Sequence, residues 1–175
     1  AALFGLTAAA ATIHGVRFAE SRQAGDLNLK LVGTGLQRYA YVYHVCVAAL
    51  YLPPGTKPTD ALTNVPKTLE IEYFHNIRAD QFATLTVKGV KANTPPAEFA
   101  RVEARLGDFV AAYQDVQPGD RYALTFLPGA GTTLALNGKT VIQVPGDDFA
   151  RALYSVWLGK EPVTEGLKAG LLGKP

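Results

Sequence analysis

A long run of strand-forming residues constrains the fold of this chain more than any other feature. From Tyr39 to Leu52 the sequence reads YAYVYHVCVAALYL, and it ends at Pro53-Pro54-Gly55. Aromatic and β-branched residues favour strands, and here apolar or aromatic residues occupy both faces that a pleated strand presents. Both faces must then be covered by other parts of the protein. The run predicts the central strand of a sheet.

Other periodic patterns surround this strand and predict its companions. Alternating patterns predict further strands, Asn-Gly predicts a tight hairpin turn, and apolar residues at helical spacing predict amphipathic helices. The expected elements begin with strands, continue with helices and end with a hairpin and further helices. This order indicates an antiparallel sheet with helices on one face. The fold class is therefore α+β. The expected strands are Thr12–Phe18, Leu27–Leu31, Lys67–Phe74, Tyr122–Phe126, Thr132–Leu136 and Thr140–Val144, with Gly33-Thr34-Gly35 interrupting the second, and the expected helices are Ala79–Lys91, one opened by Pro95-Pro96, Phe149–Leu158 and Val163–Leu172.

Length and composition narrow the classes of protein. The 175 residues fit one domain, and only 18% of them are charged against about 25% in an ordinary soluble domain. This shortage suggests extensive buried surface, including an apolar cavity. The net charge is +2 with acids and bases interleaved, so no face for nucleic acid is expected. A single cysteine and three scattered histidines predict no disulfide, no metal site and no cofactor.

The first residues resemble the end of a secretory signal sequence. Ala1–Ala11 is apolar and uncharged, and it ends in small residues that signal peptidase accepts. On this interpretation residues 1–11 are a leader remnant, residues 12–175 form one domain, and the protein is exported to the periplasm. An ordinary N-terminal helix is the alternative. No segment is apolar over the length of about 20 residues that a transmembrane helix needs.

The central run also carries the candidate binding residues. If Arg38 to Leu52 forms one strand, Arg38, His44 and Cys46 share a face. A buried arginine requires an anionic partner, and its planar fork matches a carboxylate. The alternatives stay open: a solvated Arg38, a structural His44, and Cys46 as a small buried hydrophobe. A β-bulge would exchange the two faces.

Four sequence blocks resemble the bacterial chalcone-isomerase-like proteins, and they occur in the order found in that family. They are GTGLQRYAYVYHVCVAALYLP (Gly33–Pro53), DVQPGDRYALTFLPGAGTTLALNG (Asp115–Gly138), GDDFARALYSVWLG (Gly146–Gly159) and LKAGLLG (Leu167–Gly173). The resemblance implies an open-faced β-sandwich, in which a large antiparallel sheet is covered by a layer of helices and a ligand cleft lies between them. Plant enzymes of this superfamily close a chalcone into a flavanone there, and non-catalytic members bind fatty acids through an arginine and a tyrosine.

The resemblance also implies the site residues. Arg38 is the best match to the family's arginine, with Gln37 between it and the glycine turn, and Cys46 stands where the enzymes have threonine and bacterial relatives have tyrosine. The enzymes also carry a tyrosine and an asparagine on the first cleft helix, but Ala79–Lys91 contains neither, and Phe82 and Leu85 stand nearby instead. These departures favour a monomeric, non-catalytic binder of a small apolar acid such as a fatty acid, with Arg38, His44, Cys46, Phe82 and Leu85 as ligand-binding residues. The alternative is an intramolecular lyase acting on an aromatic enone, with Arg38 stabilising the enolate.

Overall fold

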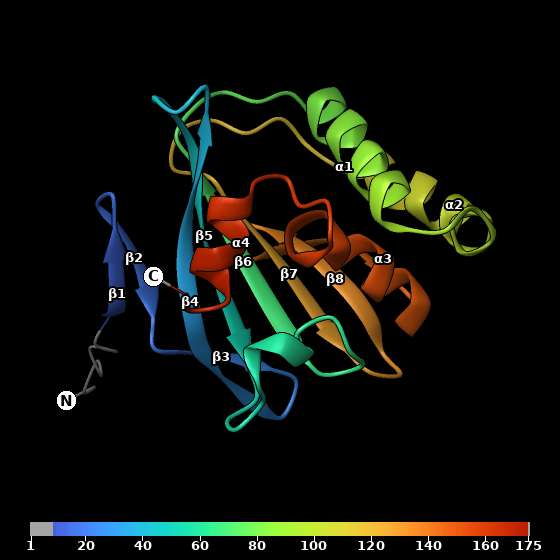
Figure 1. Ribbon diagram of the computed structural model, residues 1–175, viewed down its shortest axis with the longest axis horizontal. Coiled ribbons are helices and arrows are strands. Elements are labelled where there is room, and N and C mark those ends of the chain that lie inside the picture. Colours follow the sequence, from blue (N-terminus) through green and yellow to red (C-terminus); the bar gives the residue numbers. More distant parts are fainter. Residues whose placement is uncertain (1–8, 175) are drawn as a thin grey trace.

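Seven antiparallel strands form the main sheet in the computed structural model, which describes residues 9–174 (Figure 1). The strands lie side by side in the order in which they occur in the chain. Turns connect most of them, whereas helices lie in the long connection between β6 and β7. This arrangement confirms the predicted α+β class. The strands are β3 (Ser21–Ala24), β4 (Leu27–Tyr39), β5 (Tyr43–Leu52), β6 (Lys67–Tyr73), β7 (Arg121–Leu127), β8 (Gly131–Leu136) and β9 (Lys139–Val144).

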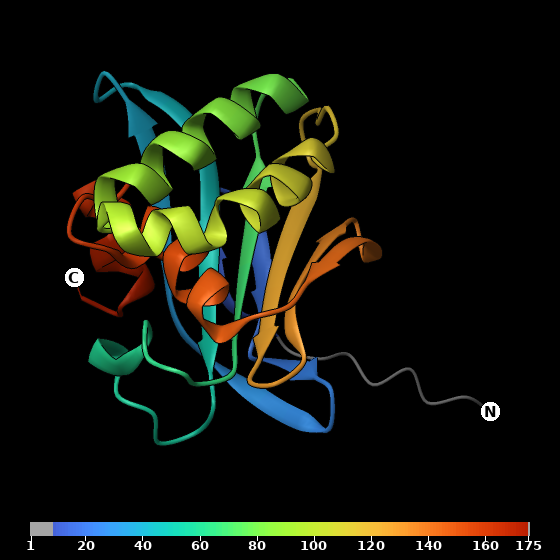
Figure 2. The ribbon, with the colours of Figure 1, turned by 90° about the vertical axis from the view of Figure 1, so that its right-hand side faces the viewer.

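Helices cover one face of this sheet, as Figure 2 shows. They are α1 (Ala79–Asn93), α2 (Pro96–Ala111), α3 (Asp147–Leu158) and α4 (Glu165–Leu171), and a short 3-10 helix, η1 (Pro58–Asp60), lies between β5 and β6. The predicted apolar stripe of α2 is buried at Val102, Leu106 and Phe109. Together with α3, it packs on the inward side chains of the sheet and forms the main core.

A separate hairpin covers part of the opposite face. It consists of β1 (Ala9–Ile13) and β2 (Val16–Ala19), and its Phe18 packs with Val47 and Tyr51 of β5. This packing explains why the central strand is apolar on both faces. The single strand expected from Thr12 to Phe18 is wrong, because a turn at His14 and Gly15, both at positive φ, divides it.

The leader assigned to residues 1–11 falls mostly outside the described residues. Residues 1–8 are not described, and Ala9–Ala11 belong to β1, which pairs with β2.

The central run is not one strand. β4 continues to Tyr39, and a turn at residues 40–42, with Ala40 and Tyr41 at positive φ, leads into β5. The interruption expected at Gly33-Thr34-Gly35 is also wrong. These residues lie within β4, and they contain glycine because α4 crosses the strand: a Cβ on Gly35 would lie 2.7 Å from the Leu167 carbonyl oxygen.

Candidate functional site

A cavity of about 360 Å³ lies between the inward face of the sheet and the helical layer. This volume falls within the range of about 300–1,000 Å³ that is usual for ligand pockets. Its walls come from β4, β5 and β6 on one side and from α1, α3 and the α3–α4 connection on the other. We call it the sheet–helix pocket. It is lined by Gln37, Val45, Cys46, Ile71, Tyr73, Ile77, Phe82, Leu85, Thr86, Lys88, Gly89, Ala92, Tyr113, Val156, Trp157, Glu161, Pro162 and Val163.

The sheet side of the pocket carries a row of three polar side chains on neighbouring strands, of which Cys46 and Tyr73 are buried and Gln37 is half-buried. Gln37 of β4 pairs in register with Cys46 of β5, which pairs with Tyr73 of β6. The Cys46 thiol donates a hydrogen bond of 3.2 Å to Gln37 Oε1. We call Gln37, Cys46 and Tyr73 the polar row.

Burial keeps the polar row uncharged. Cys46 is 1% exposed, and burial raises the pKa of its thiol to about 12, because a low-dielectric surrounding disfavours the thiolate. Burial likewise raises the pKa of the Tyr73 hydroxyl well above its ordinary value. Near neutral pH both groups are protonated, so the row presents neutral donors and acceptors.

A second polar pair lies in the wall formed by the helices. The hydroxyls of Thr86 on α1 and Tyr113, which follows α2, are 3.0 Å apart. The Tyr113 ring packs against Phe82 and Tyr122, with centroids 5.3 and 5.6 Å away. The ring cluster fixes the hydroxyl pair, because aromatic packing and the hydrogen bond act on the same side chain.

The mouth of the pocket faces solvent. Leu85 is 55% exposed, and Lys88 and Glu161 are also exposed and carry opposite charges. Trp157 is buried in the wall and is the only tryptophan of the sequence. The charged side chains of the lining, Lys88 and Glu161, thus lie at the mouth, whereas the other polar side chains of the lining, including the polar row, are uncharged.

A bulge in β5 decides which candidate residues reach the pocket. Gln37 pairs with Cys46 but Arg38 pairs with His44, so Val45 is an extra residue on β5. Val45 and Cys46 both face the pocket, and the side-chain alternation restarts beyond them. The His44 ring instead contacts the His14 ring in the β1–β2 turn, with centroids 4.7 Å apart, which places it on the outer face of the sheet.

Arg38 lies with His44 rather than with the pocket. Directly paired side chains of neighbouring strands share a face, and Arg38 is exposed near the tip of the β4–β5 hairpin. The expectation that one strand carries Arg38, His44 and Cys46 on a single face is therefore wrong. The physical reason is the turn at residues 40–42 together with the bulge at Val45.

The structure thus brings three of the five expected ligand-binding residues to one place. Cys46, Phe82 and Leu85 line the sheet–helix pocket, and Arg38 and His44 do not. Sequence reasoning missed Gln37, Tyr73 and Trp157. Tyr73 could have been found from the clean alternation of Lys67–Phe74, but its cross-strand partner required the register of the sheet.

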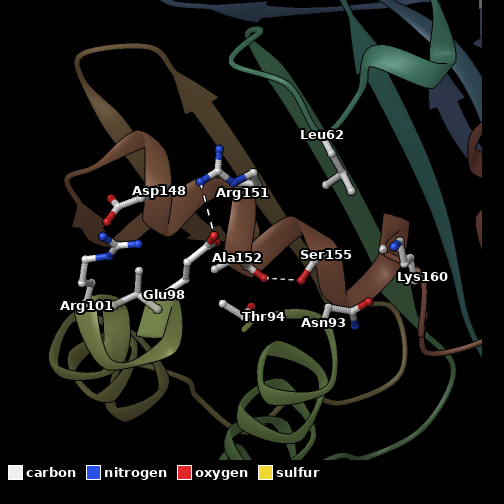
Figure 3. Close-up of a pocket in the computed structure, with 12 residues that line it drawn as sticks. Leu62, Asn93, Thr94, Glu98, Arg101, Asp148, Arg151, Ala152, Ser155 and Lys160 are labelled. Carbon is white, nitrogen blue, oxygen red and sulfur yellow. Dashed lines mark hydrogen bonds and ion pairs between the residues drawn. The ribbon is translucent and has the colours of Figure 1, made fainter. Parts of the chain in front are cut away.

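A larger cavity of about 590 Å³ lies where α2 meets α3 (Figure 3). Its charged side chains face solvent and one another: Arg151 lies 3.9 Å from Glu98, and Asp148 is bound by Arg105 at 2.7 Å. The Ser155 hydroxyl already donates to the Ala152 carbonyl at 2.6 Å. Several polar groups of this cavity are already paired with other protein groups, so the sheet–helix pocket is the better candidate site.

Within residues 9–174, no group of three or more histidine, cysteine, aspartate or glutamate side chains is placed to hold a metal ion. None of the helices in the described part of the chain has the length and apolar character needed to span a membrane.

Comparison with known proteins agrees with this architecture. The chalcone isomerase-like family matches residues 10–173. The crystal structure of an Arabidopsis thaliana fatty-acid binding protein is similar, with a TM-score of 0.68 at 16% identity over 90% of this chain and 92% of that one. At this identity the similarity establishes the fold alone. No curated protein sequence matches. The chain belongs to the chalcone isomerase-like family.

Proposed function

We propose that the protein is a non-catalytic binder of a small, largely apolar molecule of the fatty-acid type. The sheet–helix pocket carries this proposal: it holds about 360 Å³, its walls are mostly apolar, and its polar groups are few and convergent, as in ligand pockets generally. The similar Arabidopsis thaliana structure is described as a fatty-acid binding protein, which supports the same ligand class.

Trp157 makes this proposal directly testable. It lines the pocket and is the only tryptophan, so its fluorescence reports the pocket without labelling. Titration with decanoic acid and with decan-1-ol should give saturable changes in emission. Organic extraction of the purified protein followed by mass spectrometry should recover a bound lipid. The absence of both signals would contradict the proposal.

The intramolecular-lyase alternative has less support from the geometry. Stabilising an enolate requires preorganised donors or a cation beside the developing charge, and Arg38 lies outside the pocket lining. Incubation with a chalcone, followed by its visible absorbance, should show no conversion above the rate without protein. Conversion that is lost on filling the pocket would restore the enzymatic alternative.

Export is a separate proposal that rests on the apolar stretch Ala1–Ala11. Fractionation of cells that express the full-length gene product should find the protein in the periplasm. Recovery in the cytoplasmic fraction would contradict it.

A further inference from the structure

The polar row occupies a single line across three neighbouring strands, β4, β5 and β6, which lie side by side in Figure 1. Its donors and acceptors are only partly used. Gln37 Oε1 accepts from the Cys46 thiol, while within the described part of the chain the Gln37 amide nitrogen and the Tyr73 hydroxyl make no hydrogen bond. The row therefore offers both donors and acceptors to a bound molecule.

No cation accompanies the polar row. Among the residues that line the pocket, Lys88 is the one cation, and it lies at the solvent-exposed mouth together with Glu161. Arg38, one position after Gln37, lies on the other face of the sheet because the alternation of β4 continues through both residues. An anion placed against the polar row would be buried without a countercharge, which is costly.

We infer that the sheet side of the pocket takes an uncharged head group that both donates and accepts hydrogen bonds, such as a hydroxyl, a primary amide or a protonated carboxyl group, in preference to a carboxylate. The inference rests on the proposed function and refines it. It concerns the ligand's head group alone, because the apolar walls of the pocket would accept the same alkyl tail with any of these head groups.

A series of ligands with the same alkyl chain tests this inference on the unmodified protein. Decan-1-ol, decanamide and decanoate are titrated at a pH well above the pKa of decanoic acid, with Trp157 fluorescence and calorimetry as readouts. We expect the alcohol and the amide to bind at least about tenfold more tightly than the carboxylate, a difference that a buried unpaired charge easily supplies. Lowering the pH should tighten the binding of decanoic acid and leave that of decan-1-ol unchanged.

A transposition of two neighbouring residues provides the matched variant. The double substitution Gln37→Arg with Arg38→Gln keeps composition and net charge but moves the cation to the inward position. We expect it to reverse the order, so that decanoate binds more tightly than decan-1-ol. Thermal unfolding shows whether the variant is folded, and the ligand series on the unmodified protein does not depend on it.

The outcomes separate this inference from the proposed function. If none of the decyl ligands binds, the proposed function fails. If all bind but decanoate binds as tightly as or more tightly than decan-1-ol, the pocket binds lipids and the inference about the head group is wrong. An order that a folded transposed variant leaves unchanged would also contradict it.

Discussion

The thiol of Cys46 lies 3.2 Å from Gln37 Oε1 and donates a hydrogen bond to it across the β4–β5 ladder. Both side chains face the sheet–helix pocket. The hydrogen bond joins the only cysteine of the sequence to the neutral side-chain amide of Gln37, and both residues are directed inward from their strands.

Cys46 should be unreactive in the folded protein. The thiolate is the nucleophile, and burial raises the pKa of this thiol to about 12. Alkylation by iodoacetamide, followed by mass spectrometry, should be slow in the native state, slower still with decan-1-ol bound, and fast after unfolding in urea. Rapid labelling of the native protein would show that the thiol is accessible or ionised and would contradict this description.

Leu85 should contribute to binding from the mouth of the pocket. The Leu85→Asp substitution places a charge in the lining and removes apolar contact, and we expect it to weaken the binding of decan-1-ol by about tenfold. Leu85 is 55% exposed, so the change should leave stability nearly intact. Thr84→Asp is the matched control, because Thr84 is exposed on the same helix and does not line this pocket. Equal effects of the two substitutions on affinity would exclude a role for Leu85 in the site.

Gly35 should be essential to the contact between β4 and α4. A Cβ there would lie 2.7 Å from the carbonyl oxygen of Leu167, and backbone cannot give way as a flexible side chain does. We expect Gly35→Ala to lower the free energy of unfolding by about 1–3 kcal/mol, the usual cost of overpacking. Urea unfolding measures this change.

Gly107 provides the control for Gly35. It lies in α2, and a Cβ there would meet no atom within 4 Å. Gly107→Ala should raise the free energy of unfolding by about 0.5–1 kcal/mol, because alanine favours the helix. If both alanine variants are equally stable, the packing of α4 on β4 is looser than described.

Lys67 should make stability depend on alkaline pH. Its side chain is 1% exposed, its Nζ donates to the Thr63 carbonyl at 3.0 Å, and burial lowers its pKa from 10.5 to about 8. Between these two values the unfolded chain binds more protons than the folded one, so the free energy of unfolding rises with pH across this window and is constant below it. The expected gain is about 3 kcal/mol at most.

The Lys67→Met variant isolates this effect from the tyrosines, which also titrate at high pH. The difference in unfolding free energy between the unmodified protein and Lys67→Met, measured in urea at several pH values, should increase from about pH 8 to pH 10.5. A difference that does not change with pH would show that Lys67 titrates normally in the folded state.

Much of the fold followed from patterns that act over short distances in the sequence. The stripe of α2, the turn at Asn137-Gly138 and the strand predicted at Lys67–Phe74 depend on neighbouring residues. The structure confirms each of them, with the strand ending at Tyr73. The apolar character of Val47 and Tyr51 correctly indicated a second covered face.

The candidate site depended instead on details that local patterns do not specify. The turn at Ala40 and Tyr41 uses positive φ at residues that rarely adopt it, so no residue of this stretch indicates a turn. The bulge at Val45 is set by the register between two strands. Because one extra residue reverses the alternation, Arg38 and His44 lie on the outer face while Cys46 faces the pocket, so the expected single face for all three is wrong.

The bulge at Val45 has a consequence for how such a pocket can change over evolution. It reverses the inward and outward alternation of side chains at the β4–β5 hairpin tip relative to the rest of β5. Residues at the tip can therefore vary without altering the pocket wall. Conversely, the insertion or deletion of a single codon near this point would exchange inward and outward residues together. Changes in strand length, rather than stepwise substitution, are then an economical route between charged and neutral ligands.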